Sequence, residues 1–298
     1  MRTVSRFRFL ASRAPRSAHQ YALTRNGKLE TRNAKREGFT VLSSILVVIA
    51  ACTTMLVASE TDAFHWRGKV PAGQLVEIRG INGSIHAEPA AGKDVEVVAY
   101  KSGQLYEGAG VQVRVVEHNG GVTICAVYTS ADGNPTDCLP GAVSPRNLVN
   151  NDVNVDFRVR LPKGVRFLGR TVNGQVEATA LEADTEAHTV NGNVRLSTAG
   201  AALGETVNGS IVASVGKINS TSKFSTVNGA ITLEMRSTAA ADVHANTKNG
   251  PIHTDFPLAV RDELAGRHAD GVIGRGGPDL TIITVNGAIN LRRAPRTF

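Results

Sequence analysis

The segment TVNGNVRLSTAGAALGETVNGSIVA, residues 189–213, contains the motif Thr-Val-Asn-Gly twice, and polar and apolar residues alternate after each copy. The motif occurs five times in the chain, and Gly-Ile-Asn-Gly at 80–83 and Thr-Lys-Asn-Gly at 247–250 are variants of it. From Asn173 to Asn249 the motif asparagines follow one another at intervals of 18, 17, 20 and 21 residues. Such regular spacing is typical of repeat proteins, in which each unit packs only against its neighbours.

The residues that follow each Asn-Gly pair have the pattern of a β-strand. The third residue after each Asn is Val or Ile, the fifth is Ala, Leu or Thr, and the fourth is mostly polar. Because side chains alternate between the two faces of a strand, the third and fifth positions are expected to face the core. The glycine is expected to permit a corner with φ > 0, and the asparagine to form local hydrogen bonds. The corner residues are Asn82, Gly83, Asn173, Gly174, Asn191, Gly192, Asn208, Gly209, Asn228, Gly229, Asn249, Gly250, Asn286 and Gly287.

Two all-β architectures fit this pattern. One is a single-domain β-solenoid, a β-helix-like fold whose rungs each contain about 17–21 residues. The other is an antiparallel meander of β-hairpins, because Asn-Gly between alternating strands is also a strong hairpin signal. The solenoid is favoured because only stacked rungs gain from the same residues at every corner. The 37 residues from Asn249 to Asn286 then correspond to about two rungs, with Asp270-Gly271 as a degenerate corner between them.

Helical periodicity is almost absent from the sequence. Only PLAVRDELAG, residues 257–266, predicts a short helix or else a loop, since Pro stands at its start and Gly at its end. Residues 64–298 are expected to form the exported repeat domain, with irregular first rungs over 64–170 and regular rungs over 171–298. Charge and proline after the last apolar position would discourage edge-to-edge growth, so a monomer is predicted.

The N-terminal region predicts export. Residues 1–38 hold ten basic and two acidic side chains and form either a disordered extension or sequence upstream of the true start. The uncharged segment Phe39–Ala58 is about long enough to cross a bilayer. Residues 39–63 are therefore a signal peptide, an uncleaved anchor, or a lipoprotein signal whose Cys52 carries the lipid. All three place the repeat domain in the periplasm or on the cell surface, with membrane contact through the N-terminal segment only.

The net charge of +7 comes from this N-terminal region. The 260 residues that follow residue 38 hold 23 basic and 24 acidic side chains, so the exported part is close to neutral. A nucleic-acid partner is therefore not expected, because binding to phosphates requires a basic surface.

Cys125 and Cys138 are the only cysteines after the export segment, and a turn-rich loop separates them. In an oxidising compartment such a pair usually forms a disulfide, which would stabilise the fold by about 3 kcal/mol. Two buried free thiols are the alternative. A metal site is not indicated, because no CxxC partner or histidine cluster accompanies the pair.

The sequence contains no GxSxG, HExxH or GxxxxGK[ST] motif, and its exported histidines are dispersed. No catalytic residue, metal ligand or cofactor is therefore predicted. A glycan-cleaving β-helix would need paired acids, yet the acids form no repeated column, and the aromatic content of 5% offers few platforms for sugars. A non-enzymatic protein is predicted, and a glycan-active β-helix enzyme is the less favoured alternative.

The segment Gly80-Ile81-Asn82-Gly83-Ser84-Ile85 and the Thr-Val-Asn-Gly units after it resemble a family of bacterial envelope adhesins with β-strand repeats. They are similar to the GIN head domain of autotransporter-adhesin-like proteins. The likeness covers roughly residues 70–291 and extends to the segment with Cys125 and Cys138. It implies a β-helix-like solenoid and surface binding, with no catalytic residues to transfer.

Export, repetition and the resemblance together predict an adhesion-like binding module of the cell envelope. Its rigid β-surface would present outward residues such as Glu177, Arg195 and His253 to an envelope polymer, a protein or a cell-surface ligand. A periplasmic structural or signalling scaffold is the alternative.

Overall fold

The computed structural model describes residues 63–103, 110–129, 133–141, 152–216, 218 and 220–294. These residues belong to the second of the two units, Met1–Leu56 and Val57–Phe298, into which the chain divides. The predicted export segment, including Cys52, lies outside the described residues. No helix among the described residues is long and apolar enough to span a membrane.

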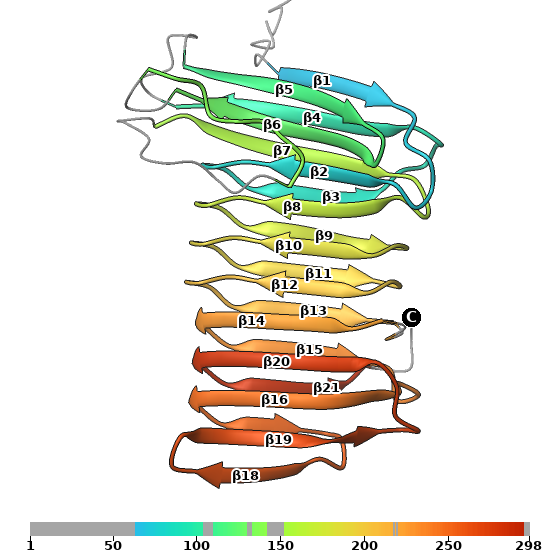
Figure 1. Ribbon diagram of the computed structural model, residues 1–298, viewed down its shortest axis with the longest axis vertical. Helices are drawn as coiled ribbons and strands as arrows, with labels where there is room; N and C mark the ends of the chain where they lie inside the picture. Colours follow the sequence, from blue (N-terminus) through green and yellow to red (C-terminus); the bar gives the residue numbers. More distant parts are fainter. Residues whose placement is uncertain are drawn as a thin grey trace, which may run out of the picture. The chain divides into compact units, whose positions relative to one another are not determined.

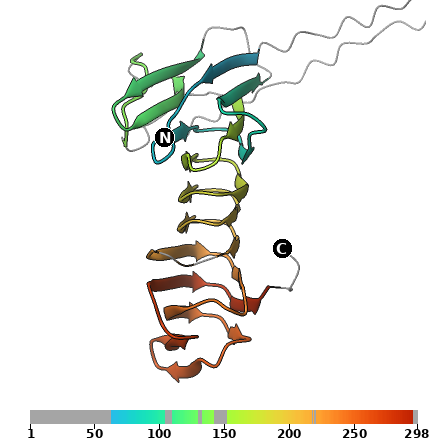
Figure 2. The same cartoon turned by 90° about the vertical axis from the view of Figure 1, so that its right-hand side faces the viewer.

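The described residues form 21 strands in two sheets, which make the two layers of a stack of rungs (Figures 1 and 2). In spatial order, the ten-stranded sheet contains β1 (Ala63–Gly68), β4 (Val95–Ser102), β7 (Asn154–Leu161), β3 (Ile85–Pro89), β9 (Val176–Leu181), β11 (Val194–Thr198), β13 (Ile211–Val215), β15 (Ile231–Met235), β21 (Ile289–Arg293) and β17 (Ile252–Thr254). The eleven-stranded sheet contains β18 (Ala259–Glu263), β19 (Gly266–Ile273), β16 (Ala241–Asn249), β20 (Asp279–Asn286), β14 (Ser222–Asn228), β12 (Ala202–Glu205), β10 (Thr185–His188), β8 (Arg166–Arg170), β2 (Leu75–Arg79), β6 (Gly121–Tyr128) and β5 (Val111–His118).

Each regular rung runs from a strand of the eleven-stranded sheet, through a motif corner, to a strand of the ten-stranded sheet. Successive rungs pair in parallel and in register, so that Val194, Ile211 and Ile231 lie side by side on β11, β13 and β15. The two strands joined by a corner belong to different sheets, which excludes the hairpin meander. The prediction of an all-β, solenoid-like fold is thus confirmed.

The core lies between the two sheets and is built from the positions that the repeat assigns to it. The third and fifth residues after the corner asparagines are buried, as for Ile211 and Ala213, which are both 0% exposed, and only Thr254 among them is partly exposed. The opposite sheet contributes larger side chains, including Phe167 and Phe224, which are also 0% exposed. The ten-stranded sheet contributes Phe157, which is 1% exposed, so large side chains fill the core from both sheets.

The rungs do not stack in sequence order. β20 lies between β14 and β16, and β21 lies between β15 and β17, so the last rung of the chain is inserted between the two rungs before it (Figure 1). Asp270-Gly271 was predicted to be a corner, and this prediction is wrong. Both residues belong to β19, which runs antiparallel to β16. Because β19 occupies the outer edge of β16, only the inner edge of β16 remains for β20.

The segment 257–266 forms neither a helix nor a loop throughout. Its residues Ala259–Glu263 form β18, which pairs antiparallel with β19 at the end of the eleven-stranded sheet. A single ten-residue helix is only marginally stable by itself, whereas the edge of β19 offers backbone partners to an extended chain.

The first rung, β2 and β3, carries additional strands. β4 and β7 pair antiparallel in the ten-stranded sheet, and β5 and β6 do so in the eleven-stranded sheet. β7 then pairs in parallel with β3, and β6 with β2, so these additions continue the same two layers.

Candidate interaction surface

The threonine of each corner points into the fold and ties adjacent rungs together. The threonine side chains are buried, as for Thr189 and Thr206, which are both 5% exposed. Each hydroxyl donates to the backbone oxygen of the corner glycine on the neighbouring rung, at 2.8–3.0 Å. The pairs are Thr171 and Gly83, Thr189 and Gly174, Thr206 and Gly192, Thr226 and Gly209, Thr284 and Gly229, and Thr247 and Gly287.

The corner asparagines form a ladder along the same edge. From Asn173 onward, each side-chain Nδ2 donates to the Oδ1 of the asparagine before it in the ladder, at 2.8–2.9 Å. The ladder runs in the order Asn82, Asn173, Asn191, Asn208, Asn228, Asn286 and Asn249. These amides therefore satisfy one another, which makes them structural parts of the edge.

The corner glycines are required mainly by close stacking. A Cβ on Gly192 would lie 2.0 Å from the backbone oxygen of Gly174, and a Cβ on Gly209 would lie 1.9 Å from that of Gly192. The sequence led us to expect a φ in the left-handed region at each corner glycine. Gly83 has such a φ, at 118°, but Gly192 and Gly209 do not. The contact between rungs, rather than the corner conformation, is thus the general reason for glycine.

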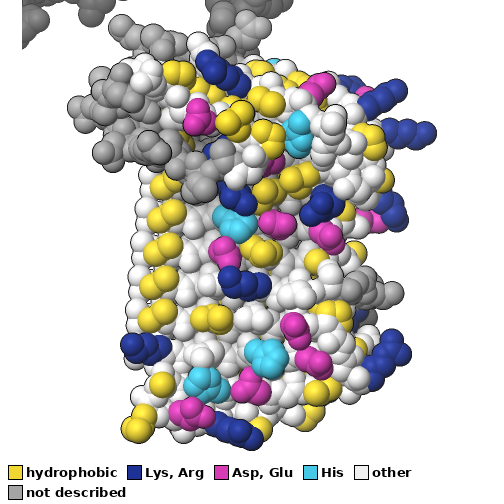
Figure 3. Space-filling model, viewed as in Figure 1, with side chains coloured by type: hydrophobic (Ala, Val, Ile, Leu, Met, Phe, Trp, Pro, Cys, Tyr) yellow, Lys and Arg dark blue, Asp and Glu magenta, His cyan; other side chains and the backbone are white. Residues whose placement is uncertain are grey.

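The valines of the motif point outward between the threonine and the asparagine. Val190, Val207 and Val227 are 38%, 39% and 39% exposed, and they are aligned by the pairing of their rungs. Figure 3 shows apolar side chains in a column along the left edge of the molecule, with a basic side chain below them. We call this column the valine edge; its members are Val172, Val190, Val207, Val227 and Val285, and Lys248 occupies the same motif position on the next rung.

The outer face of the eleven-stranded sheet carries a row of charges close to the valine edge. The two imidazole nitrogens of His188 lie 3.2 Å from the Glu205 carboxylate and 3.7 Å from that of Glu186, and the Lys223 ammonium donates to Glu205 at 2.7 Å. The hydrogen bond with His188 lowers the pKa of Glu186. Burial raises the pKa of Glu205, but the hydrogen bond from Lys223 and the charges around it outweigh burial, so the net shift is downward. Both carboxylates of the row therefore have a partner within it.

The outer face of the ten-stranded sheet is also paired internally. Glu177 lies 3.7 Å from Arg195 and 3.5 Å from His86. Two of the three residues predicted to present the surface to a ligand, Glu177 and Arg195, are thus engaged with each other, and the third, His253, is exposed on β17 at the far end of the sheet. This face does not concentrate an unpaired charge at the predicted positions.

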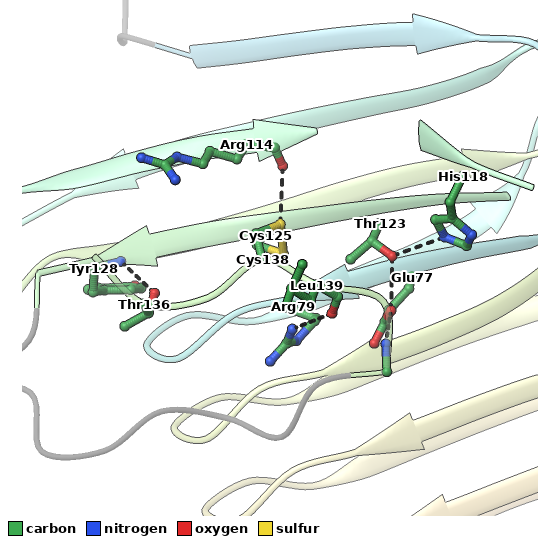
Figure 4. The surroundings of a disulfide bond; sticks show 11 residues. Glu77, Arg79, Arg114, His118, Thr123, Cys125, Tyr128, Thr136, Cys138 and Leu139 are labelled. Atoms are coloured by element: carbon green, nitrogen blue, oxygen red, sulfur yellow. Dashed lines mark hydrogen bonds between the residues drawn. A yellow bond between two sulfur atoms is a disulfide. The ribbon is translucent and has the colours of Figure 1, made fainter. Parts of the chain in front are cut away.

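A disulfide joins Cys125 on β6 to Cys138, with a Cα–Cα distance of 5.8 Å. It holds the segment 133–141 over the outer face of β2 (Figure 4). The buried Glu77 carboxylate accepts from the Thr123 hydroxyl at 3.0 Å and from the Gly141 backbone N–H at 3.1 Å. Arg79 donates to the Leu139 backbone oxygen at 2.9 Å, and its pKa is lowered by burial. Sequence reasoning missed both of these covered charged side chains.

The Glu77, Thr123 and His118 group is not a catalytic site. The His118 imidazole lies 3.3 Å from the Thr123 hydroxyl, but Thr123 is 0% exposed, so a substrate could not reach that oxygen. No group of three or more His, Cys, Asp or Glu side chains that could hold a metal ion occurs in the part of the chain that the structure describes.

Tyr128 fixes the first corner from inside the fold. Its hydroxyl lies 3.2 Å from the backbone oxygens of Asn82 and Val153, and the ring is fully buried. Burial raises the pKa of Tyr128 to about 12. The tyrosine therefore stays neutral and anchors Asn82, where the ladder begins.

The chain matches no protein-family model and no curated protein. Among solved structures, it is similar to a "putative cell adhesion protein" from Clostridium sporogenes, with 12% identity, a TM-score of 0.38, and coverage of 78% of this chain and 100% of that chain. It is also similar to a "putative adhesin" from Bacteroides fragilis, with 11% identity, a TM-score of 0.26, and coverage of 78% and 97%. At these TM-scores neither likeness supports an argument about this chain, and the resemblance to the GIN head domain stays a prediction.

Proposed function

We propose that the repeat domain is a non-enzymatic binding module of the cell envelope, and that the valine edge is its contact surface. The observation that carries the proposal is the column from Val172 to Val285, in which apolar side chains stay partly exposed on successive rungs. Scattered apolar residues are normal on a protein surface, whereas a contiguous apolar strip is typical of an interaction site.

The construction of the edge supports this role. Threonine bonds on its inner side and the asparagine ladder on its outer side hold the valines of successive rungs about 4.8 Å apart. A surface that is already rigid loses little conformational entropy on binding, so even modest apolar contacts contribute to affinity. The disulfide between Cys125 and Cys138 is consistent with an oxidising compartment outside the cytoplasm.

Lys248 makes a clean test available. It occupies the valine position on the outermost rung of the ladder and is exposed there, so the corner accepts a lysine side chain. The triple variant V190K/V207K/V227K should therefore fold while losing the apolar strip. The matched control is V212K, because Val212 is 36% exposed but lies on the outer face of the ten-stranded sheet.

Purified full-length chain would be titrated onto isolated envelopes of the cells that produce it, and the bound fraction measured. The triple variant is expected to bind at least tenfold more weakly than the wild type, and V212K to bind as the wild type does. Equal binding by all three proteins would refute the role of the valine edge. Added protease on intact cells separates a surface position, in which the domain is cleaved, from a periplasmic one.

A further inference from the structure

The last rung of the chain fills a slot between two rungs that precede it in sequence. β20 pairs in parallel with β14 on one side and with β16 on the other, and β21 pairs likewise with β15 and β17. Leu280, Ile282, Ile289 and Leu291 are all 0% exposed. The inserted rung, Asp279–Arg293, therefore separates its two neighbours in both sheets and supplies the strand pairing to each of them.

The inserted rung follows every other strand of the described residues in the sequence, so its release would not draw any of those strands through the fold. A five-residue linker, Gly274-Arg275-Gly276-Gly277-Pro278, joins it to β19 and crosses the start of β16. A Cβ on Gly274 would lie 2.6 Å from the Ala239 backbone oxygen. The φ angles of Gly274 and Gly276 are 63° and 77°, which only glycine adopts at low cost. The folded-back linker thus depends on its glycines.

The slot is selective for one kind of occupant. Asn286 bonds to Asn228 on one side and to Asn249 on the other, both at 2.8 Å. Thr284 donates to the Gly229 backbone oxygen, and the Gly287 backbone oxygen accepts from Thr247. A strand pair that makes all four bonds must itself carry Thr-x-Asn-Gly at the same register. A second copy of this chain carries the same rung, with the same core residues.

We propose that the inserted rung exchanges between two copies of the chain, so that β20 and β21 of each copy fill the slot of the other. Every contact of the closed form is reproduced in such a dimer, and only the path of the linker changes. Exchange of an identical element is a low-cost route to a dimer for this reason. The closed form is the monomer that the sequence predicts, and the dimer forms from it when the rung is released.

The exchange also has a consequence for the valine edge. Val285 belongs to the inserted rung, so each copy in the dimer completes the edge of the other. The dimer then carries two complete edges on one particle, which increases avidity for a repetitive surface without any new contact. This consequence rests on the proposed function of the valine edge, whereas the exchange itself does not. Dimer formation and binding to envelopes are measured in separate experiments, so a negative result in one does not decide the other.

The first test uses cysteine pairs across the slot in the full-length chain with a C52S background. Val227 and Val285 are neighbours, because Thr226 pairs with Thr284 and Asn228 with Asn286 on either side of them. One copy carries V227C and the other carries V285C. The two are unfolded together without reductant, refolded as a mixture, and treated with a short bis-maleimide.

Exchange should give a covalent heterodimer, because it places the two introduced thiols on adjacent rungs. The matched control is a mixture of V190C with V285C, in which both cysteines are on the valine edge but two rungs lie between their rungs. The V227C mixture is expected to give at least fivefold more covalent heterodimer than the control mixture. Equal yields would overturn the proposal.

The second test changes the linker alone. The G274A/G276A variant strains the folded-back path, so its dimer fraction by light scattering should rise about fivefold, as a difference of about 1 kcal/mol implies. The control is G73A, because Gly73 has a φ of 85° but lies in a turn outside the slot, with no atom within 4 Å of its Cβ position. G73A should lower stability without forming dimer. A linker variant that stays as monomeric as G73A contradicts the proposal.

Discussion

Asn286 donates its side-chain amide to Asn228 at 2.8 Å although the two residues are 58 positions apart. Asn249 lies between them in sequence but stands beyond Asn286 in the ladder, where it makes the terminal bond. An interior asparagine therefore makes two ladder bonds, as a donor to one neighbour and an acceptor from the other, whereas Asn249 makes one. This difference between positions gives the ladder a measurable energetic signature.

N208A should lower the free energy of unfolding by about 1–2 kcal/mol, because it removes two exposed side-chain hydrogen bonds. The bonds lost are those with Asn191 and Asn228, both 2.8 Å long. N249A removes a single bond and should cost about half as much. Urea titration followed by circular dichroism measures both variants. If N208A and N249A lower the free energy of unfolding by the same amount, the asparagines do not stabilise the fold through their ladder hydrogen bonds.

The repeat made the rung and its inward positions predictable, because identical motifs must stack to bury the alternating apolar residues. The order of the rungs could not be predicted. β16 with β17 and β20 with β21 carry equivalent Thr-x-Asn-Gly corners, and their core positions differ mainly in Thr254 on β17, which takes the place of Leu291 on β21. The local sequence therefore allows either strand pair against β14 and β15. The antiparallel return of β19 along β16 decides the order, and nothing in the local sequence of β20 records it.

The candidate surface was only partly accessible to sequence reasoning. Strand alternation assigned Glu177 and Arg195 to the outside, but their mutual ion pair depends on the stacking of β9 on β11. The outward position of the valine edge follows from the same alternation, because Thr206 is buried and Val207 is next to it. Glu77 is buried because the disulfide of Cys138 holds the segment 133–141 over it. This is a tertiary contact, and the sequence around Glu77 gives no indication of it.

G209A should disrupt the stack. Its Cβ would lie 1.9 Å from the Gly192 backbone oxygen, and the backbones of both corners are held by hydrogen bonds between rungs, so neither can move aside cheaply. We expect a loss of about 3 kcal/mol or more, at the upper end of the cost of overpacking a core. The control is G92A, since Gly92 has no atom within 4 Å of its Cβ position. Thermal unfolding that is unchanged by both substitutions would show that the stacking is looser than the distances indicate.

Removing the disulfide should lower the stability of the domain by about 3 kcal/mol, because the unfolded chain regains the freedom of the closed loop. The double variant C125A/C138A tests this in urea. It should also expose the segment 133–141 to limited proteolysis, since that segment covers Glu77, which accepts from the Gly141 N–H, and Arg79, which donates to the Leu139 backbone oxygen. The double variant should no longer respond to reductant. The C52S variant should keep the full response, and an equal response in both would assign the redox effect to another bond.

The paired carboxylates should make the fold sensitive to acid. The folded-state pKa values of Glu186 and Glu205 lie below their ordinary value of 4.5. The stability that they contribute is therefore complete above that value and is lost as the pH falls through their lower, folded-state values. The melting temperature of the wild type should fall with pH below about 4.5.

E205Q removes a carboxylate that pairs with both His188 and Lys223, so the acid-induced fall in its melting temperature should be shallower than in the wild type. The matched control is E117Q, because Glu117 lies on the edge strand β5 and forms no ion pair with the described residues. The melting temperature of E117Q should depend on pH as that of the wild type does. Because a substitution that merely weakens the fold lowers the melting temperature at every pH, the slope below pH 4.5, and not the value at neutral pH, reports the carboxylate. An unchanged slope in E205Q would show that the row of charges on the eleven-stranded sheet does not stabilise the rungs.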